Sequence, residues 1–484
     1  MSSSPEPRRV GEFEWEIPIG HVDGMRVPGR IFASDALFHK AAEDHSIEQV
    51  ANVATLPGIV GASYAMPDLH WGYGFPIGGV AATDISCGGA ISPGGVGFDI
   101  GCGVRLLRSE LPWNDIRTRL PDLVRSLGRM VPRGVGGKGR LQCSPQEMDQ
   151  VLQEGVKFPL AHGVGWEEDA EMTEDSGTLA GARPAFVSDR AKERGGAQLG
   201  SLGAGNHFLE VQVVEQILDA PAADAMRLWQ GQVCVMIHSG SRGVGHQACT
   251  DYIKVFDRVM GELGIVLPDR QLACLPVEHD LAQRYLGAMD AGGNFARANR
   301  HVLADGARAA FEQVLGAGAR DMGMATVYDI SHNLAKIESY EVDGRPRELC
   351  VHRKGATRAF GPNHPELPER YARFGQPVMV PGSMGTASYV LAGLEGARER
   401  SFSSACHGAG RLMSRTKARK VMDGHTLREQ LSSEGILLAG SSSKLLSEEA
   451  PYAYKDVSDV VAVCEGAGLT KTVARLRPVG VVKG

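Results

Sequence analysis

The sequence contains no Cys-x-x-Cys pair, although it has nine cysteines. It also lacks an uninterrupted apolar run of about 18 residues, the shortest length that reads as a membrane-spanning helix. No apolar segment follows the charged residues at its start, as an export signal would require. An odd number of cysteines without a signal is typical of reduced thiols in the cytosol. We therefore expect a cytoplasmic protein with no membrane segment.

The chain also has no excess of positive charge. Lysine and arginine number 51 against 57 aspartates and glutamates, so the net charge is -6. Any basic surface for nucleic acid must therefore be local. A composition of 43% hydrophobic and 22% charged residues, with 62 glycines, excludes a disordered chain and indicates a globular protein with many tight turns.

Apolar runs of strand length alternate with amphipathic helical patterns, which is the rhythm of an α/β protein. Residues 232–237 predict a strand, and residues 247–263 predict a helix with one apolar face. Further helices are predicted at about 308–315 and 410–422. No repeat or linker divides the chain, but residues 134–196 are irregular and predict an inserted subdomain or a mobile loop.

A glycine-rich loop places a carboxylate and a thiol three residues apart. Asp99 and Cys102 lie in the segment GFDIGCG, which begins at Gly97. Glycine permits tight turns with positive φ, so both side chains can face one point. Alone the pair is a weak signal, because a buried cysteine is usually a small apolar residue. The loop is a candidate metal site that needs further ligands.

Four histidines share a sequence context. Each lies next to a short apolar run and beside glycine, serine or asparagine: His207, His238, His332 and His407. In α/β proteins, binding sites form where strands end. Imidazole suits transition metals, a thiolate can bridge two ions, and a carboxylate adds a hard ligand. A two-metal cluster could thus consist of Asp99, Cys102, His207, His238 and His332. These donors suit zinc as well as manganese, and each histidine alone could equally be structural.

His407 has a different setting from the other three. It precedes Gly408-Ala409-Gly410 and a run of basic residues, which predicts a position at a helix amino terminus. Unpaired N–H groups and the helix dipole there favour phosphate and disfavour a protonated imidazole, so a neutral nitrogen could attack phosphorus. The alternative is a helix cap followed by a solvated basic face.

Two more segments have features of a phosphate or nucleotide site. Residues 381–388 (PGSMGTAS) combine glycines, which let a backbone approach closely, with hydroxyl donors. Residues 352–358 (HRKGATR) form a basic cluster that could grip a polynucleotide backbone or be an ordinary solvated surface.

Together these segments resemble the RtcB family of RNA ligases. The resemblance rests on GFDIGCGVR at Gly97, SLGAGNHFLEVQ at Ser201, HSGSRGVGH at His238, YDISHN at Tyr328, HRKGATRAFGP at His352, PGSMGTASYVL at Pro381 and HGAGR at His407. These segments follow the family order over nearly the whole chain, and only residues 134–196 match less well. The resemblance implies an α/β (α+β) RtcB-like fold, with one large integrated catalytic domain over residues 1–484, mixed sheets and surrounding helices.

The resemblance also implies an activity. RtcB ligases use GTP to join RNA ending in a 2′,3′-cyclic phosphate or 3′-phosphate to RNA beginning with a 5′-hydroxyl, in tRNA splicing or RNA repair. His407 matches the family's nucleophile, which forms a histidine–GMP intermediate, and Asp68 matches the carboxylate that orients it. GMP then activates the RNA 3′-phosphate for attack by the 5′-hydroxyl. Some family members depend on a small activating protein, archease.

The family binds two manganese ions. Asp99, Cys102 and His207 match the ligands of one ion, and Cys102, His238 and His332 match those of the other, so that the Cys102 thiolate bridges the two. Contacts with the guanine nucleotide are implied at Asn206, His207, Phe208, Leu209, Glu210, His332, Asn333, Pro381, Gly382, Ser383, Met384, Ser388, His407, Gly408, Ala409, Gly410, Tyr454 and Lys483. A carboxylate at Glu210 and an ammonium at Lys483 would favour guanine, because adenine reverses that donor and acceptor pattern.

Two other functions are compatible with the same residues. A two-metal phosphoesterase could use these ligands with a metal-bound hydroxide, but it would need neither GTP nor a nucleophilic histidine. A non-catalytic RNA-binding protein could keep a ligase fold without turnover. Both remain alternatives at the level of sequence.

Overall fold

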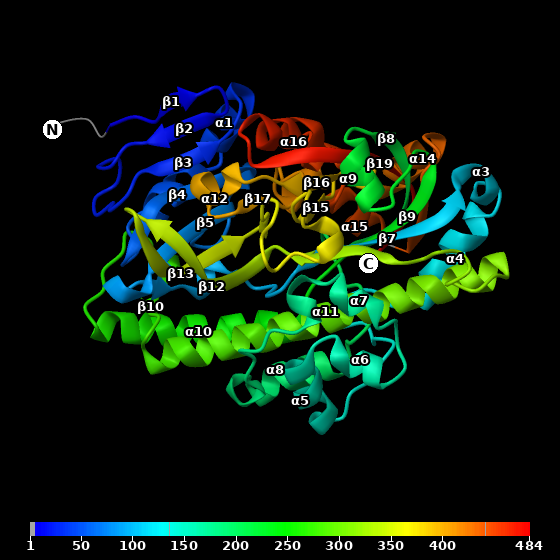
Figure 1. The fold of residues 1–484 in the computed structure, drawn as a ribbon, viewed down its shortest axis with the longest axis horizontal. Coiled ribbons are helices and arrows are strands. Elements are labelled where there is room, and N and C mark those ends of the chain that lie inside the picture. The colour runs from blue at the N-terminus through cyan, green and yellow to red at the C-terminus, as the bar shows by residue number, and fades with distance from the viewer. Residues whose placement is uncertain (1–4, 135, 441) are drawn as a thin grey trace.

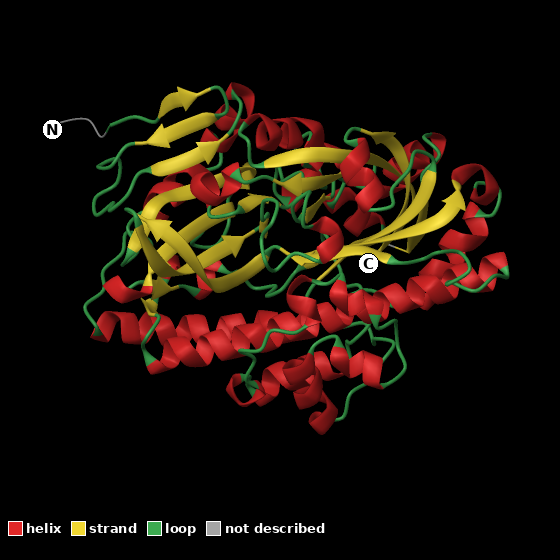
Figure 2. Ribbon diagram, viewed as in Figure 1, coloured by secondary structure: helices red, strands yellow, loops and turns green. Residues whose placement is uncertain are grey.

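Two large β-sheets form the centre of the molecule, and helices cover them (Figures 1 and 2). The computed structural model describes residues 5–134, 136–440 and 442–484. The first sheet has the strand order β1 (Arg8–Gly11), β2 (Glu14–Ile17), β3 (Gly29–Phe32), β4 (Ile59–His70), β5 (Ile77–Asp84), β13 (Arg345–Lys354) and β12 (Asn333–Val342). Most of its strands are antiparallel, but β3 and β4 are parallel, so the sheet is mixed.

The second sheet carries the strands that matter most for the candidate site. Its order is β11 (Thr326–Ser331), β7 (Gly103–Pro112), β9 (Gln232–Ser239), β8 (Phe208–Ile217), β19 (Thr470–Lys483), β16 (Ser388–Gly393) and β15 (Pro377–Val380). An eighth strand, β18 (Leu437–Gly440), pairs with β19 in parallel. Two small sheets join β6 (Ala90–Ile91) to β10 (Leu275–Pro276) and β14 (Ala356–Arg358) to β17 (Ser404–Cys406).

Two long helices run side by side along one side of both sheets (Figure 1): α10 (Arg242–Glu262) and α11 (Asp280–Leu315). Beyond α11 lie the short helices α5 (Pro145–Glu154), α6 (Lys157–Ala161) and α8 (Asp189–Gly196). Helix α7 (Glu168–Glu171) lies beside α11, where Asp169 pairs with Arg308. The remaining helices are α1 (Asp35–Ala42), α2 (Ser46–Val53), α3 (Trp113–Ile116), α4 (Leu120–Met130), α9 (Ala220–Ala225), α12 (Gly396–Ser401), α13 (Arg415–Ala418), α14 (Gly424–Ser433), α15 (Ser443–Glu448) and α16 (Val457–Gly466). Within the described residues, no helix has both the length and the apolar character needed to cross a bilayer.

The irregular region at 134–196 packs against α11 through an apolar cluster. Its side chains Val151, Leu152 and Phe158 share this cluster with Phe295 and Val302 of α11. Burying these side chains against a helix that also covers the second sheet ties the region to the rest of the chain. That this region is an insertion in a single domain stays a prediction.

Local predictions from the sequence succeed where an element is buried and regular. The strand predicted at 232–237 is β9, and the helix predicted at 247–263 is most of α10. The helix predicted at 308–315 is the last part of α11, which is 36 residues long. The helix predicted at 410–422 is wrong, because only Arg415–Ala418 is helical there. Gly410 has φ +73° and Arg411 forms a β-bridge with Tyr454, so the chain cannot continue as a helix.

Candidate active site

The register of four neighbouring strands brings the predicted metal ligands together. Cys102 directly precedes β7, where Val104 pairs with His238 of β9. His238 in turn pairs with Phe208, the residue after His207. His332 follows β11, whose last residue pairs with Gly103. A Cβ at Gly103 would lie 2.2 Å from the Ile330 oxygen, so only glycine permits this close approach of β7 and β11.

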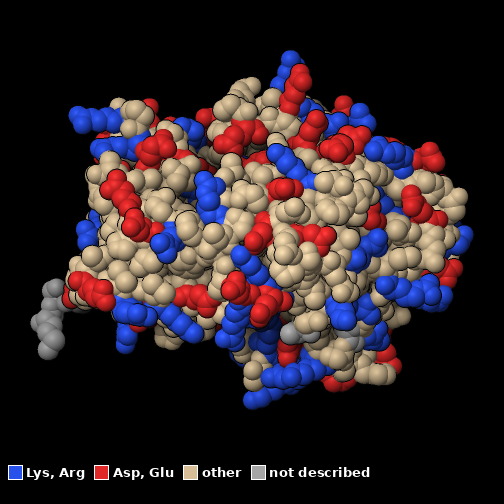
Figure 3. Space-filling view, turned by 90° about the horizontal axis from the view of Figure 1, so that it is seen from below, with Lys and Arg blue, Asp and Glu red and all other residues tan. Residues whose placement is uncertain are grey.

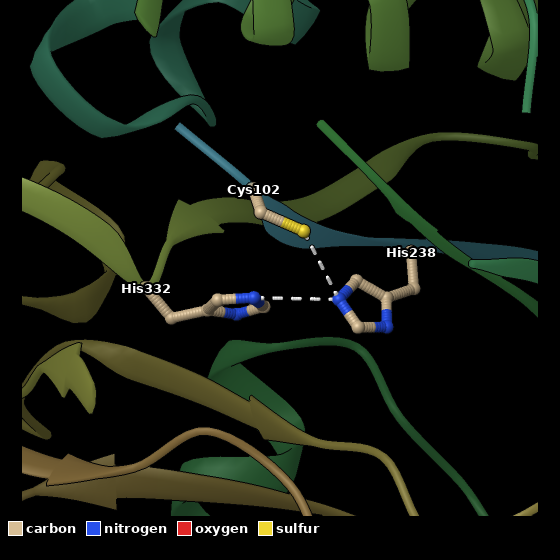
Figure 4. Close-up of side chains that lie close together, drawn as sticks. All are labelled: Cys102, His238 and His332. Carbon is tan, nitrogen blue, oxygen red and sulfur yellow. Dashed lines mark hydrogen bonds between the residues drawn. The ribbon is translucent and has the colours of Figure 1, made fainter. Parts of the chain in front are cut away.

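The ligand atoms form two overlapping groups that share Cys102. In one group, shown in Figure 4, the Cys102 Sγ lies 3.4 Å from His238 Nε2, which lies 3.3 Å from His332 Nε2. In the other, Cys102 Sγ lies 3.3 Å from His207 Nε2, and His207 Nε2 lies 2.9 Å from Asp99 Oδ2. The ligand atoms of each group lie within 4.8 Å of one another. The structure therefore brings the five predicted ligands to one place.

The electrostatics of these groups fit a transition metal. Burial, followed by the charges of neighbouring histidines, holds the pKa values of His238 and His332 well below the usual range, so both rings are neutral and keep a lone pair. Burial raises the pKa of Asp99, but the hydrogen bond and charge of His207 outweigh it, so the carboxylate is ionised. Burial and Asp99 raise the pKa of the Cys102 thiol, whose proton a bound cation would displace.

His407 lies beside this cluster and is paired with Asp68. The His407 ring is 4.9 Å from the His332 ring, centre to centre. Asp68 Oδ2 accepts from the backbone N–H of His407 at 2.9 Å and lies 2.5 Å from its Nδ1. Burial raises the pKa of Asp68, but the charge and hydrogen bonds of His407 outweigh this effect. The net pKa is lowered, so the carboxylate is ionised. Whenever the ring is neutral, this contact with the carboxylate places its hydrogen on Nδ1 and leaves the lone pair on Nε2.

The predicted position of His407 at a helix amino terminus is wrong. His407 follows β17 and enters a loop, and α13 begins only at Arg415. The helix dipole therefore does not act on its ring. The buried Asp68 carboxylate, which comes from β4 in the other large sheet, fixes the ring instead.

A cavity of about 400 Å³ opens beside His407. The predicted nucleotide contacts that line it are Asn206, Phe208, Pro381, Gly382, Ser383, Met384, His407, Gly408, Ala409, Gly410, Tyr454 and Lys483. The predicted contacts outside this lining are His207, Leu209, Glu210, His332, Asn333 and Ser388. The metal ligand His238 also lines the cavity, so the cavity and the metal cluster adjoin.

Comparison with known proteins identifies the family. The family model described as "tRNA-splicing ligase RtcB" matches residues 49–484. The chain belongs to the RtcB family. It is 50% identical over 477 residues to "tRNA-splicing ligase RtcB" of Archaeoglobus fulgidus, which covers 99% of this chain and 98% of the relative. It is 52% identical over 438 residues to "RNA-splicing ligase RtcB" of Mycobacterium tuberculosis, which covers 90% of this chain and the whole relative. The predicted family and the predicted mixed α/β fold are confirmed.

Sequence analysis missed the acidic residue that lines this RtcB-family cavity, Glu449. It is only 1% exposed, and its carboxylate accepts from Arg415 Nε at 2.8 Å, from Arg411 Nη1 at 3.2 Å and from the Tyr454 hydroxyl. These contacts hold the loop after His407 against the cavity wall. No local pattern marks Glu449, because its partners lie up to 38 positions away.

The exposed aromatic residue Trp71 was also missed. It is 59% exposed, yet it lines the cavity next to His70. Its sequence signal is its position three residues after Asp68, in the segment MPDLHW.

The basic segment at 352–358 does not form a surface. Arg353 and Lys354 of β13 and Arg358 of β14 are each at most 6% exposed. Arg353 binds Glu338 through two hydrogen bonds of 2.8 Å, and Arg358 Nε lies 3.0 Å from Glu174. Both interpretations of this segment, a polynucleotide grip and a solvated surface, are therefore wrong. Its two guanidinium charges are paired with carboxylates inside the protein, and Lys354 donates to the backbone oxygens of Tyr73 and Phe75.

Lys483 is fixed in the second sheet, although it is the next-to-last residue. It pairs with Phe208 across β19 and β8, is 4% exposed, and its ammonium lies 5.9 Å from the centre of the Phe208 ring. The buried Glu210 lies nearby and accepts a hydrogen bond of 2.8 Å from Gln212. Burial raises the pKa of Glu210 to about 7, against the opposing effects of Gln212 and Lys483.

The raised pKa of Glu210 predicts a pH-dependent stability that Glu210→Gln removes. The folded pKa of about 7 exceeds the ordinary value of 4.5, so the folded state binds the proton more tightly. Stability from this group is therefore present below about pH 4.5 and is lost as pH rises to about 7. Between pH 5 and pH 8 the wild type should lose about 3 kcal/mol of unfolding free energy that Glu210→Gln, which cannot titrate at this position, does not lose. Urea denaturation at both values checks this, and parallel curves for the two proteins would contradict it.

Proposed function

We propose that this protein is a GTP-dependent RNA ligase that joins 2′,3′-cyclic phosphate or 3′-phosphate ends of RNA to 5′-hydroxyl ends, in tRNA splicing or RNA repair. The observation that carries this proposal is the His407–Asp68 pair beside two ligand groups that share Cys102. A phosphoesterase has no use for a histidine prepared in this way. The names of the relatives, which are splicing ligases, support the same function.

The two ligand groups would hold two manganese ions. Asp99, Cys102 and His207 would bind one, and Cys102, His238 and His332 the other. A mixed set of thiolate, imidazole and carboxylate fits such a cation, and the neutral rings of His238 and His332 are ready to donate. Bound there, the ions would neutralise charge on the phosphate oxygens.

The His407–Asp68 pair performs the first chemical step. The lone pair on Nε2 attacks the α-phosphorus of GTP, a nitrogen–phosphorus bond forms, and the bond to the bridging oxygen breaks to release pyrophosphate. The ring keeps its Nδ1 hydrogen and becomes positively charged. Asp68, which lies 2.5 Å from Nδ1, stabilises that charge without moving.

The later steps transfer the nucleotide and join the RNA. A cyclic phosphate is first hydrolysed to a 3′-phosphate, whose oxygen attacks the phosphorus of histidine–GMP and frees His407. The 5′-hydroxyl of the second RNA then attacks the activated 3′-phosphate, and GMP leaves. The 3′-phosphate, a poor electrophile, thereby gains a good leaving group.

The cavity beside His407 would hold the guanine nucleotide. Its glycine-containing wall at residues 381–384 suits close contact with phosphate or ribose. Lys483 also lines the cavity, and its ammonium can donate to the guanine O6. Glu210 lies outside the lining, so its contact with the guanine N1 and N2 groups rests on the family resemblance. The charge of Lys483 acts on both Glu210 and Glu449.

The cellular setting follows from the thiols and the family. All nine cysteines are free, which supports a reducing, cytoplasmic location. Repeated turnover with an archease activator is part of the proposal, and an assay with and without that protein decides it.

Labelled GTP tests the central proposal. Purified protein is incubated with manganese and GTP labelled at the α- or the γ-phosphate, then denatured. We expect the α-label alone to remain on the chain, in a bond that is labile to acid and stable to alkali, as for a phosphoramidate. If neither label attaches although the metal is present, the two-metal phosphoesterase is favoured. An adduct that never joins RNA would favour the non-catalytic alternative.

A further inference from the structure

A groove lined by arginines lies at the end of the second sheet, between α4 and β18. It has a volume of about 520 Å³. Among its described lining residues none is acidic, and four are arginines: Arg125, Arg129, Arg133 and Arg428. Its floor is apolar and includes Val124 and Leu438. The lining therefore combines positive charge with an apolar base.

This lining differs from the surface around it. The whole chain is negative, with a net charge of -6. On the face seen from below, both basic and acidic side chains are spread over the surface (Figure 3). A concave surface that holds four positive groups and no negative one therefore stands out from the average surface.

Three of the four arginines follow one another at intervals of four residues. Arg125 and Arg129 are four residues apart on α4, so they lie on the same face of that helix. Arg133 follows at the same spacing, and a Cβ at Gly440 would lie 2.1 Å from its Nε, so its guanidinium lies against β18. Across the groove, Arg428 donates to the Gly440 oxygen at 2.9 Å and to the Leu438 oxygen at 3.3 Å. These contacts fix the two inner guanidinium groups.

The outer arginines are open to solvent. The side chain of Arg125 is 66% exposed, and its salt bridge with Asp122 is exposed on both sides and contributes little stability. Arg129 is also exposed. Both can therefore bind a polyanion without breaking a buried interaction.

Short contacts link the segments that line the groove to those that line the candidate active site, although the two linings share no residue. Gly134, next to Arg133, donates its N–H to the Gly203 oxygen at 2.9 Å, in the loop that leads to His207. Arg242 donates to the Gly134 oxygen at 3.1 Å from the active-site side. In β18, Gly440 pairs with Lys483, which lines the cavity. The groove and the cavity therefore lie on neighbouring strands, β18 and β19.

We propose that this groove binds the phosphate backbone of the RNA substrate at a distance from the ends being joined. The inference rests on the proposed ligase function. Guanidinium groups bind phosphate oxygens through paired hydrogen bonds, and several of them suit a chain of phosphates rather than a single anion. Because such contacts carry no sequence information, they would hold RNAs of different sequence equally.

A double variant on α4 tests the groove. Binding of single-stranded 3′-phosphate RNA of several lengths is measured over a salt series for Arg125→Ala/Arg129→Ala. If each arginine contacts one phosphate, the slope of log K against log salt should fall by about 1.4, since each contact on a single strand contributes about 0.7. RNA too short to reach the groove should bind to the double variant as tightly as it binds to the wild type. Arg125→Lys/Arg129→Lys should keep the slope.

The matched control is Arg8→Ala/Arg9→Ala, which removes the same charge from β1 at the far end of the molecule (Figure 1). It should leave the slope unchanged. Equal slopes for the α4 variant and the wild type would overturn the proposal that the groove binds RNA. An acidic protein would then be the partner that its charge favours. Formation of the protein–GMP adduct by the wild type is scored separately, because it needs no RNA. Its absence would reject the ligase proposal rather than the groove.

Discussion

Replacing His407 by alanine is expected to abolish attachment of GMP to the protein while leaving its metal content unchanged. The Nε2 atom of His407 is the proposed nucleophile, and no other group replaces a missing nucleophile, so we expect a loss of roughly 10⁶-fold in adduct formation. His407 belongs to neither ligand group, so both ions should remain. Labelled GTP and elemental metal analysis on the same preparation measure both quantities.

Two further variants sharpen this test. Asp68→Asn keeps the shape of the buried side chain but removes the charge that stabilises a positive ring, and we expect a loss of about 10⁴-fold, as for other carboxylate–histidine pairs. His425→Ala removes an exposed histidine of α14 whose side chain is 78% exposed, and it should attach GMP like the wild type. An adduct in His407→Ala would reject the nucleophile assignment, and full activity of Asp68→Asn would reject the role of the carboxylate.

The sequence predicted that five candidate ligands lie together, and the structure places them so, while their binding of metal stays a prediction. Each ligand lies in a short motif whose residue types suit a metal, and glycine explains how the Asp99 loop turns, with φ +94° at Gly97 and +70° at Gly101. The order in which β11, β7, β9 and β8 pair could not be predicted, because it depends on contacts between strands far apart in the chain. Only this order brings His207, His238 and His332 to Cys102.

The sequence predictions that failed involve charged residues whose partners are distant. The basic run after His407 looks like a solvated helix, but the buried Glu449 pairs with Arg411 and Arg415, and helix α13 begins only at Arg415. Likewise, Arg358 looks like a surface cation, but its partner Glu174 lies in the region that sequence left unread. In both cases an ion pair inside the protein outweighs local helix propensity or the usual exposure of arginine.

Replacing Cys102 by serine is expected to remove at least one of the two ions. The Cys102 Sγ lies 3.3 Å from His207 Nε2 and 3.4 Å from His238 Nε2, and it is the one residue common to both ligand groups found among the described residues. A serine hydroxyl is nearly the same size, so the fold should persist. It gives up its proton far less readily than a thiol and bridges two soft or borderline cations poorly. RNA joining should fall at least about 100-fold, because removal of supporting residues alone costs 10–100-fold at metal sites.

The control for this variant is Cys274→Ser, which changes another fully buried cysteine that belongs to neither ligand group. It packs in a separate apolar cluster with Leu272 and Phe75, so the substitution tests the general cost of a buried hydroxyl. We expect this protein to be less stable but to keep two ions per chain. Full occupancy by two ions in Cys102→Ser, measured by elemental analysis after dialysis, would show that the thiolate does not bridge them. Loss of metal in both variants would assign the effect to weakened folding, because only Cys102 contacts the ligand histidines.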